Sequence, residues 1–334
     1  MVKVSVNGFG TIGKRVADAI SKQRDMTLVG VSKTTPDYFS RMAQEFGLYV
    51  PRGKEREFED RGISVEGSIE DMVENSDLVI DCTPEGQGMR NKEELYEKLG
   101  VKAIFQGGEK AEVAQVSFVA QCNYEEAIDK DFVRVVSCNT TGLARTLGSL
   151  QPLGIKKARV TLIRRAADPK EHRKGPINAI VPDPPRTPSH HGPDVRTVLK
   201  DLDIVTMAVK VPTTIMHLHT VMLEMNEEVK RDDIISHLED APRIILVSSD
   251  MGMKSTASLI EYFRDLGRKR GDIYEIVVFE DSVSVEGREV YYMQAVHQEA
   301  DVVPENVDAV RAMFDLADKD ESIETTDKSL GIWR

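Results

Sequence analysis

Residues 2–20 read VKVSVNGFGTIGKRVADAI and contain the strongest fold signal in the chain. Valine alternates with other residues over 2–7, as in a strand, and apolar residues recur at helical spacing after residue 13. The glycines between these segments follow the pattern G-x-G-x-x-G. A strand, a glycine turn and a helix in this order are typical of the start of a parallel sheet with helical crossovers.

Each glycine of this turn is expected to have its own structural role. Gly8 permits the tight turn, Gly10 lets the backbone approach a pyrophosphate, and Gly13 allows the helix to pack closely on the strand. Amide groups at the helix start then face a phosphate, where the helix dipole favours negative charge. The stretch predicts a dinucleotide-binding domain, and a purely structural glycine turn is the alternative.

The end of the next predicted strand, 26–32, bears on which dinucleotide is bound. A site that prefers NAD usually has an acidic residue there, which binds the ribose hydroxyls. This sequence continues with Lys33, Thr34 and Thr35 and has no acid before Asp37. A lysine or a hydroxyl can instead bind a 2′-phosphate. We therefore expect NADP to be preferred and NAD to be accepted, with a solvated lysine as the alternative.

The lengths and the order of the predicted strands and helices divide the chain into two domains. Short strands alternate with helices over 1–138, which predicts a Rossmann doubly wound parallel sheet. Longer alternating strands follow over 139–300, which predicts an α+β catalytic domain with a mixed or antiparallel sheet and helices on one face, one of them near 195–202. A well-signalled helix lies in 301–334, and we expect it to pack back on the first domain.

Composition narrows the function further. The 334 residues include 44 Lys plus Arg against 56 Asp plus Glu, a formal charge of −12, which disfavours a general nucleic-acid surface. No apolar run is long enough to span a membrane. Three widely spaced cysteines suggest neither a disulfide framework nor a metal site, and they fit a reducing compartment. We expect a cytoplasmic protein without a resident metal.

One cysteine has the context of a nucleophile. Cys138 follows an apolar strand and precedes a helical run, so unpaired amides and the helix dipole should stabilise its thiolate and lower its pKa. The same amides can stabilise the oxyanion that forms when a thiolate attacks a carbonyl. Cys82 and Cys122 have no such context, and we expect both to be packing residues.

Histidines are the candidate bases for such a thiol. His217 and His219 lie two apart on a predicted strand and should project from the same face. The residues alone leave open which of the two acts and which is a structural partner. His190 and His191 lie in a loop rich in proline and glycine, where they are better placed to meet a phosphate.

Several segments resemble the archaeal branch of the glyceraldehyde-3-phosphate dehydrogenases. The nucleophile segment reads Ser137-Cys138-Asn139-Thr140-Thr141, where the common bacterial and eukaryotic branch has Ser-Cys-Thr-Thr-Asn. The other matching segments are IDCTPEG (80–86), IFQGGEK (104–110), PSHHGPDV (188–195), VPTTIMHLH (211–219) and YYMQAVHQEADVVPEN (291–306). Together they span nearly the whole chain, so the resemblance is specific.

The resemblance implies a role for individual residues. It makes Cys138 the nucleophile and His217 the catalytic histidine. It places cofactor contacts at Thr11, Ile12, Gly108, Arg165 and Gln298, with Arg164 as the alternative to Arg165, and substrate contacts at Ser137, Asn139, His191 and Gly192.

The resemblance also implies an activity. A homotetramer would oxidise D-glyceraldehyde 3-phosphate with NAD or NADP and inorganic phosphate, giving 1,3-bisphosphoglycerate through a cysteine thiohemiacetal and thioester. A semialdehyde or acyl-phosphate reductase, such as aspartate-semialdehyde dehydrogenase, is the enzymatic alternative. A cofactor-sensing or nucleic-acid-binding regulator without catalysis is the alternative from another class.

Overall fold

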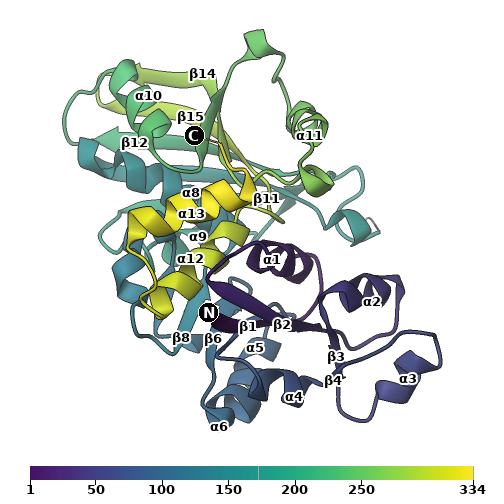
Figure 1. Ribbon diagram of the computed structural model, residues 1–334. Coiled ribbons are helices and arrows are strands. Elements are labelled where there is room, and N and C mark those ends of the chain that lie inside the picture. The colour runs from purple at the N-terminus through teal and green to yellow at the C-terminus, as the bar shows by residue number, and fades with distance from the viewer. Residues whose placement is uncertain (172, 334) are drawn as a thin grey trace. The chain divides into compact units, whose positions relative to one another are not determined.

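The chain forms two compact units in the computed structural model, which describes residues 1–171 and 173–333 (Figure 1). The first unit consists of Met1–Ser137 together with Val303–Gly331. The second consists of Cys138–Val302 and the last residues from Ile332 onward. The chain therefore passes from one unit to the other between Ser137 and Cys138.

An eight-stranded sheet organises the first unit, in the order β4-β3-β2-β1-β5-β6-β8-β7. Every pairing in it is parallel. The strands are β1 (Val2–Asn7), β2 (Met26–Ser32), β3 (Leu48–Val50), β4 (Gly67–Ser68), β5 (Leu78–Asp81), β6 (Lys102–Gln106), β7 (Val116–Phe118) and β8 (Phe132–Val135). The central strands are buried throughout their apolar positions, as expected for a parallel sheet covered on both faces.

Helices of the first unit connect these strands, and the last two come from the end of the chain. The connecting helices are α1 (Gly13–Ile20), α2 (Tyr38–Ala43), α3 (Glu55–Glu59), α4 (Ile69–Glu74), α5 (Gln87–Asn91), α6 (Glu97–Leu99) and α7 (Ala120–Asn123). The terminal pair is α12 (Val303–Met313) and α13 (Lys319–Leu330), and α12 packs against α1. Arg311 of α12 is buried and binds Asp25 (2.7 Å) and Thr326 of α13 (2.6 Å). These bonds tie the terminal helices to the region just before β2.

A seven-stranded mixed sheet organises the second unit, in the order β10-β11-β9-β12-β15-β14-β13. Its strands are β9 (Ile155–Arg165), β10 (Val181–Pro182), β11 (Ile204–Val211), β12 (His217–Met225), β13 (Ile244–Val247), β14 (Ile276–Glu286) and β15 (Glu289–Val296). β9 pairs parallel with β11 and antiparallel with β12, whereas β12, β15 and β14 pair antiparallel in succession. The predicted fold class, a Rossmann sheet plus an α+β unit with a mixed sheet, is confirmed.

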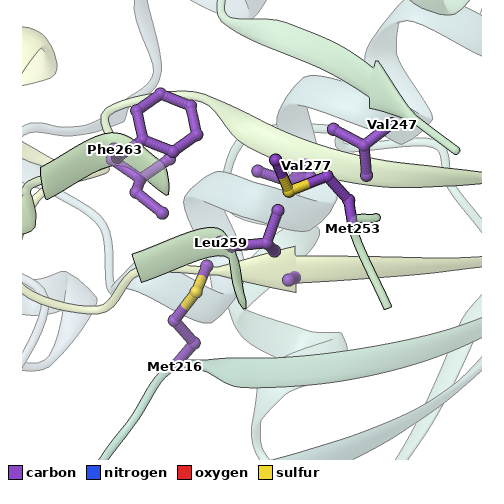
Figure 2. Close-up of a cluster of buried hydrophobic side chains, with 8 residues drawn as sticks. Met216, Val247, Met253, Leu259, Phe263 and Val277 are labelled. Atoms are coloured by element: carbon purple, nitrogen blue, oxygen red, sulfur yellow. The ribbon is translucent and has the colours of Figure 1, made fainter. Parts of the chain in front are cut away.

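The helices of the second unit lie on both faces of its sheet, so the expectation of one covered face was wrong. Its helices are α8 (Cys138–Leu150), α9 (His191–Val195), α10 (Arg231–Asp240) and α11 (Thr256–Asp265). α8 and α10 pack on each other and on β14. On the opposite face, Leu259 and Phe263 of α11 pack with Val277 and Met216 in a buried cluster (Figure 2). The sheet is apolar on both faces there, so each face attracts a helix.

The helix expected near 195–202 is also displaced. It spans only His191–Val195, and turns follow it. Gly192 at its second residue donates its N–H to Oγ1 of Thr206 across 2.9 Å, which fastens the start of this helix to β11. The shift matters because it places His191 and Gly192 on an ordered helix start rather than in an irregular loop.

Candidate active site

The glycine turn after β1 has the geometry that a dinucleotide phosphate requires. Gly8 has φ +106°, and a Cβ there would lie 2.8 Å from the carbonyl oxygen of Cys82. A Cβ on Gly13 would lie 1.9 Å from the carbonyl oxygen of Gly8. Nothing lies within 4 Å of the place where a Cβ of Gly10 would stand. Packing therefore demands glycine at the first and third positions, and open space at the second leaves room for a ligand.

Two other predicted cofactor residues and the predicted substrate residue Ser137 lie at the same sheet edge. Lys33 follows β2, Gly108 follows β6 by two residues, and Ser137 follows β8 by two residues. Because all these strands are parallel, their carboxyl ends meet at one edge, beside the glycine turn that follows β1. A Cβ on Gly107 would lie 2.0 Å from the backbone nitrogen of Ser137, so this second glycine also allows a close approach. Sequence reasoning missed Gly107, although its place in QGGEK was visible.

Lys33 is not a free cation. Its Nζ lies 2.8 Å from Oδ2 of Asp37, the first acid after β2, and 5.7 Å from the ring centre of Phe39. The lysine side chain is only 13 % exposed. Thr34 and Thr35 are exposed. A 2′-phosphate at this loop would thus compete with Asp37 for the ammonium group.

In the second unit, Cys138 and Asn139 are the first residues of α8, and both are buried. The Oδ1 atom of Asn139 accepts a hydrogen bond from Nε2 of His219 across 2.9 Å. The amide of Gln294 donates to Nδ1 of the same ring across 3.1 Å. Both ring nitrogens of His219 are therefore occupied, and this histidine holds Asn139 in place.

His217 differs from its neighbour in having an open ring nitrogen. The backbone N–H of Arg165 donates to its Nδ1 across 2.9 Å. Its Nε2 atom is buried and has no hydrogen-bond partner among residues 1–171 and 173–333. Because Nδ1 accepts, the proton of the neutral ring is on Nε2, where it can be donated to a reacting atom.

The electrostatics of the thiol depart from the sequence-based expectation. Burial, followed by the charge of Asp301, raises the pKa of the Cys138 thiol above its ordinary value, whereas Arg164 and Arg165 act to lower it. Burial outweighs the position at a helix start. Burial disfavours the charged form of a histidine too, so burial and then the charge of Arg164 lower the pKa of His219 to about 3. The resting site thus combines a thiol with neutral imidazoles.

The side chain of Arg165 is fully engaged in ion pairs and a hydrogen bond with residues of its own unit. Its guanidinium lies 2.5 Å from Oε1 of Glu299 and 2.5 Å from Oδ1 of Asp168, and its Nε donates to Oε1 of Gln298 across 2.6 Å. The side chain is 1 % exposed. The predicted cofactor residues Arg165 and Gln298 are therefore bonded to each other, and Arg165 holds Gln298 rather than presenting a free cation.

Arg164 points to the other face of β9. Its Nη1 pairs with Asp183, which directly follows β10, and its Nε is buried with no partner in the described part of the chain. Its charge lowers the pKa of His217 and of His191, in each case after the larger effect of burial. Of the two adjacent arginines, Arg164 therefore keeps one donor without a partner in the described part of the chain.

The predicted loop residues are ordered as well. Nδ1 of His191 lies 3.1 Å from Oγ of Ser189, and its ring stacks on that of His190 with centres 4.0 Å apart. Burial, then the charges of His190, Arg164 and His219, lower the pKa of His191 to about 2. His191 therefore remains neutral at physiological pH and can offer hydrogen bonds but no charge.

A glycine-turn parallel sheet joined to a unit that carries a thiol at a helix start, with histidines behind it, defines a nicotinamide-dependent oxidoreductase. Residues 137–282 match the family model described as "Glyceraldehyde 3-phosphate dehydrogenase, C-terminal domain", and residues 2–122 match "Dihydrodipicolinate reductase, N-terminus". The chain belongs to the glyceraldehyde-3-phosphate dehydrogenase family, so the predicted resemblance is confirmed.

Relatives along the full length support this membership. The chain is 61% identical to the glyceraldehyde-3-phosphate dehydrogenase of Methanopyrus kandleri, over 99% of this chain and 97% of the relative. The enzymes of that name from Metallosphaera sedula and Thermococcus kodakarensis are 58% and 57% identical, with 98% and 99% of their lengths covered. The chain is an enzyme, and the reductase and regulator alternatives gain no support.

The described residues contain neither a membrane-spanning helix nor a metal-binding cluster. None of the helices in this part of the chain has the length and apolar character needed to cross a membrane. No group of three or more His, Cys, Asp or Glu side chains among residues 1–171 and 173–333 is arranged to hold a metal ion.

Proposed function

We propose that the protein oxidises D-glyceraldehyde 3-phosphate to 1,3-bisphosphoglycerate with NAD(P) and inorganic phosphate. The observation that carries the proposal is the arrangement around α8. Cys138 opens the helix, Asn139 beside it is fixed by His219, and His217 keeps an open Nε2 two residues away on the same strand face. We assign Cys138 as the nucleophile and His217 as its catalytic partner.

The first half-reaction forms a thioester on Cys138. The thiol releases its proton to solvent, and the thiolate adds to the aldehyde carbon to give a thiohemiacetal alkoxide. Nε2–H of His217 and the first amides of α8 can stabilise this alkoxide. When bound, NAD(P) would supply the hydride acceptor for this step, and loss of the hydride from the alkoxide on Cys138 would leave the thioester carbonyl.

This scheme revises the expected task of His217. The sequence made His217 a candidate base, which would remove a proton from the reacting groups. With its proton on Nε2, the ring instead favours donation to the alkoxide, and the proton released overall is that of the thiol. To act as a base at Nε2, His217 would have to adopt the other tautomer and lose the hydrogen bond from the Arg165 amide.

The second half-reaction releases the product. An oxygen of inorganic phosphate attacks the thioester carbonyl, the C–S bond breaks, and the Cys138 thiolate returns. We propose that Ser137, Asn139, His191 and Gly192 contact the substrate. Gly192 and Asn139 are supported by the fixed positions that Thr206 and His219 give them.

We also propose that NADP is preferred over NAD. Gly8, Gly10, Thr11, Ile12 and Gly13 would hold the pyrophosphate. Lys33 and Thr34 would contact the 2′-phosphate. Gly108 would contact the part of the cofactor that joins its two rings. Gln298, which is held by Arg165, would lie toward the nicotinamide. The lack of an acid directly after β2 supports this preference.

A homotetramer in the cytoplasm completes the proposal. The sheet of the second unit leaves part of one face open, with Met207, Met222 and Met293 48%, 38% and 40% exposed. An apolar groove of about 560 Å³ adjoins Met293. Exposed apolar sheet faces of this kind support contact between subunits. The three free cysteines support a reducing compartment.

Measurement of initial rates tests which reaction the protein catalyses. The purified protein is assayed with D-glyceraldehyde 3-phosphate, with and without inorganic phosphate, using NAD and NADP in turn. We expect reduction of both cofactors and a strict need for phosphate under turnover. Faster reduction of another acyl phosphate, such as aspartyl phosphate, in the reverse direction would instead favour the semialdehyde dehydrogenase alternative. Light scattering measures the oligomer mass.

A further inference from the structure

We propose that Tyr96 is a positioning residue for the cofactor site. A chain of buried hydrogen bonds runs from its hydroxyl group to the first amide of the glycine turn and fixes the shape in which that turn binds a pyrophosphate. Tyr96 is fully buried, so it acts on the cofactor through the turn and not by contact. The inference rests on the proposed function, because it takes the glycine turn after β1 as the pyrophosphate site.

Ser32, the last residue of β2, holds the start of the glycine turn at two points. The N–H of Gly8 donates to its Oγ atom, and the N–H of Phe9 donates to its carbonyl oxygen, each across 2.8 Å. The Ser32 hydroxyl in turn donates to Oδ1 of Asn7, the residue before the turn, across 2.6 Å. The turn therefore cannot change shape at its first two residues without breaking bonds to a buried serine.

Asn7 continues this chain of bonds to Tyr96. Its Nδ2 atom donates to the tyrosine hydroxyl oxygen across 2.8 Å, and that hydroxyl donates to Oδ2 of Asp81 across 2.7 Å. Every bond points the same way, from the Gly8 amide to the Asp81 carboxylate, and hydrogen bonds in such a chain polarise and strengthen one another. Burial, followed by the charge of Asp81, raises the pKa of Tyr96 well above its ordinary value, so the hydroxyl keeps its proton and remains a donor.

Asp81 gives the chain of bonds a fixed end. It is the last residue of β5 and lies directly opposite Asn7 in the pairing of β5 with β1. Its Oδ1 accepts from the N–H of Thr83 across 2.9 Å, and its Oδ2 also accepts from Nδ2 of Asn91, in α5, across 2.7 Å. Because several donors hold this carboxylate, a tyrosine bonded to it is held as well.

Packing alone does not explain a tyrosine at position 96. Its ring lies in an apolar cluster with Val79, Val101 and Phe105, where a phenylalanine would fill the same space without burying a polar group. Tyr96 ends the π-helical turn Lys92–Tyr96, and such turns occur often at functional sites. The hydroxyl therefore serves the hydrogen-bond chain that ends at the glycine turn.

The variant Y96F removes the hydroxyl and keeps the ring. Dissociation constants of the full-length protein for NADP and for NAD, measured by calorimetry, should both rise about tenfold, because the turn serves the pyrophosphate of either cofactor. Their ratio should not change, in contrast to a variant of Lys33. At saturating cofactor, kcat and the KM for the aldehyde should stay within about twofold of normal. A tyrosine that only stabilised the fold would lower stability and leave both dissociation constants unchanged.

Y124F is the matched control. Tyr124 belongs to the same unit, is 1% exposed and donates its hydroxyl to the carbonyl of Ala317 across 3.0 Å. The loss of this bond should lower the urea midpoint but leave both dissociation constants within about twofold of normal. If Y124F weakened cofactor binding as much as Y96F, the effect of Y96F would be one of general stability and the proposal would be wrong.

The variants S32A and Y96F, alone and combined, test the path between Tyr96 and the turn. If Tyr96 acts through Ser32, each single variant weakens cofactor binding, and the double variant binds no more weakly than S32A alone. If the two effects multiply, Tyr96 acts by another route and the proposal is wrong. Unchanged dissociation constants in Y96F would overturn the proposal and leave the proposed function standing, whereas failure of the unmodified protein to bind either cofactor would overturn both.

Discussion

The backbone N–H of Arg165 and Nδ1 of His217 are joined by a hydrogen bond of 2.9 Å. This bond fixes the tautomer of a buried histidine through the main chain of the neighbouring strand, so among substitutions of Arg165 only proline, which lacks an N–H, removes the donor. The bond leaves Nε2–H as the ring donor without a partner among the described residues. The guanidinium of the same arginine is fastened to Glu299 and Asp168, which holds the strand end in register.

Replacing the thiol should abolish turnover. We expect C138S to lower kcat by about 10³-fold or more, because in the same buried site a serine hydroxyl is a far weaker acid than a thiol and forms the anionic nucleophile far less readily. Binding of NADP, measured by fluorescence titration, should be unchanged within about twofold. C122S is the control and should keep normal kcat. Retention of more than a tenth of the normal kcat in C138S would contradict the covalent mechanism.

Replacement of each of the two histidines of β12 should change different kinetic constants. H217N should lower kcat by about 10²–10⁴-fold, since it removes the donor that faces the alkoxide. H219N should act mainly through Asn139, raising KM for the aldehyde with a smaller loss in kcat. Single-turnover measurements of hydride transfer distinguish these effects. The roles must be exchanged if H219N gives the larger loss in the chemical step.

Acid should weaken the second unit through Glu299. Burial acts to raise the pKa of Glu299, but His297 and Arg165 outweigh it, so its folded-state pKa lies below the usual 4.5. A lowered pKa contributes stability that is present above about pH 4.5 and is lost as the pH falls toward the folded-state value. We expect the free energy of unfolding of the unmodified protein to fall in that range.

E299Q should lack this acid-dependent component and should be less stable at pH 7, because the buried guanidinium of Arg165 loses one of its carboxylates. Urea denaturation at pH 7 and at pH 4 measures both effects. E227Q, whose side chain is 86% exposed, is the control. Equal acid sensitivity of E299Q and the unmodified protein would show that another group is responsible.

Cofactor preference should follow Lys33 and its partner. K33M should lower kcat/KM for NADP by about ten- to hundredfold and leave the value for NAD nearly unchanged. D37N should raise the NADP to NAD ratio, because Lys33 no longer divides its charge between the carboxylate and a 2′-phosphate. A ratio below one in the unmodified enzyme would show that the loop after β2 does not select NADP.

Local patterns in the sequence are enough to predict the parallel sheet, the glycine turn and the mixed sheet. Gly8 and Gly13 are required by contacts with the backbone a few residues away or on the adjacent strand, so their spacing alone is informative. The period-2 pattern of β12 likewise predicts that His217 and His219 share one face, and both are buried there. Such features depend on neighbours along the chain.

Only the tertiary structure decided which of two similar residues is free to act. Arg164 and Arg165 are adjacent, yet Arg164 pairs with Asp183 and keeps one unpartnered donor among the described residues, whereas Arg165 is enclosed by Glu299 and Asp168. His219 is satisfied by Asn139 and Gln294, whereas His217 keeps an open nitrogen. The sequence alone cannot tell which member of each pair is free. Hydrogen-bond partners and burial come from residues far apart in the chain. Together they determine the charge and the tautomer of a side chain and which of its atoms remain free to bind.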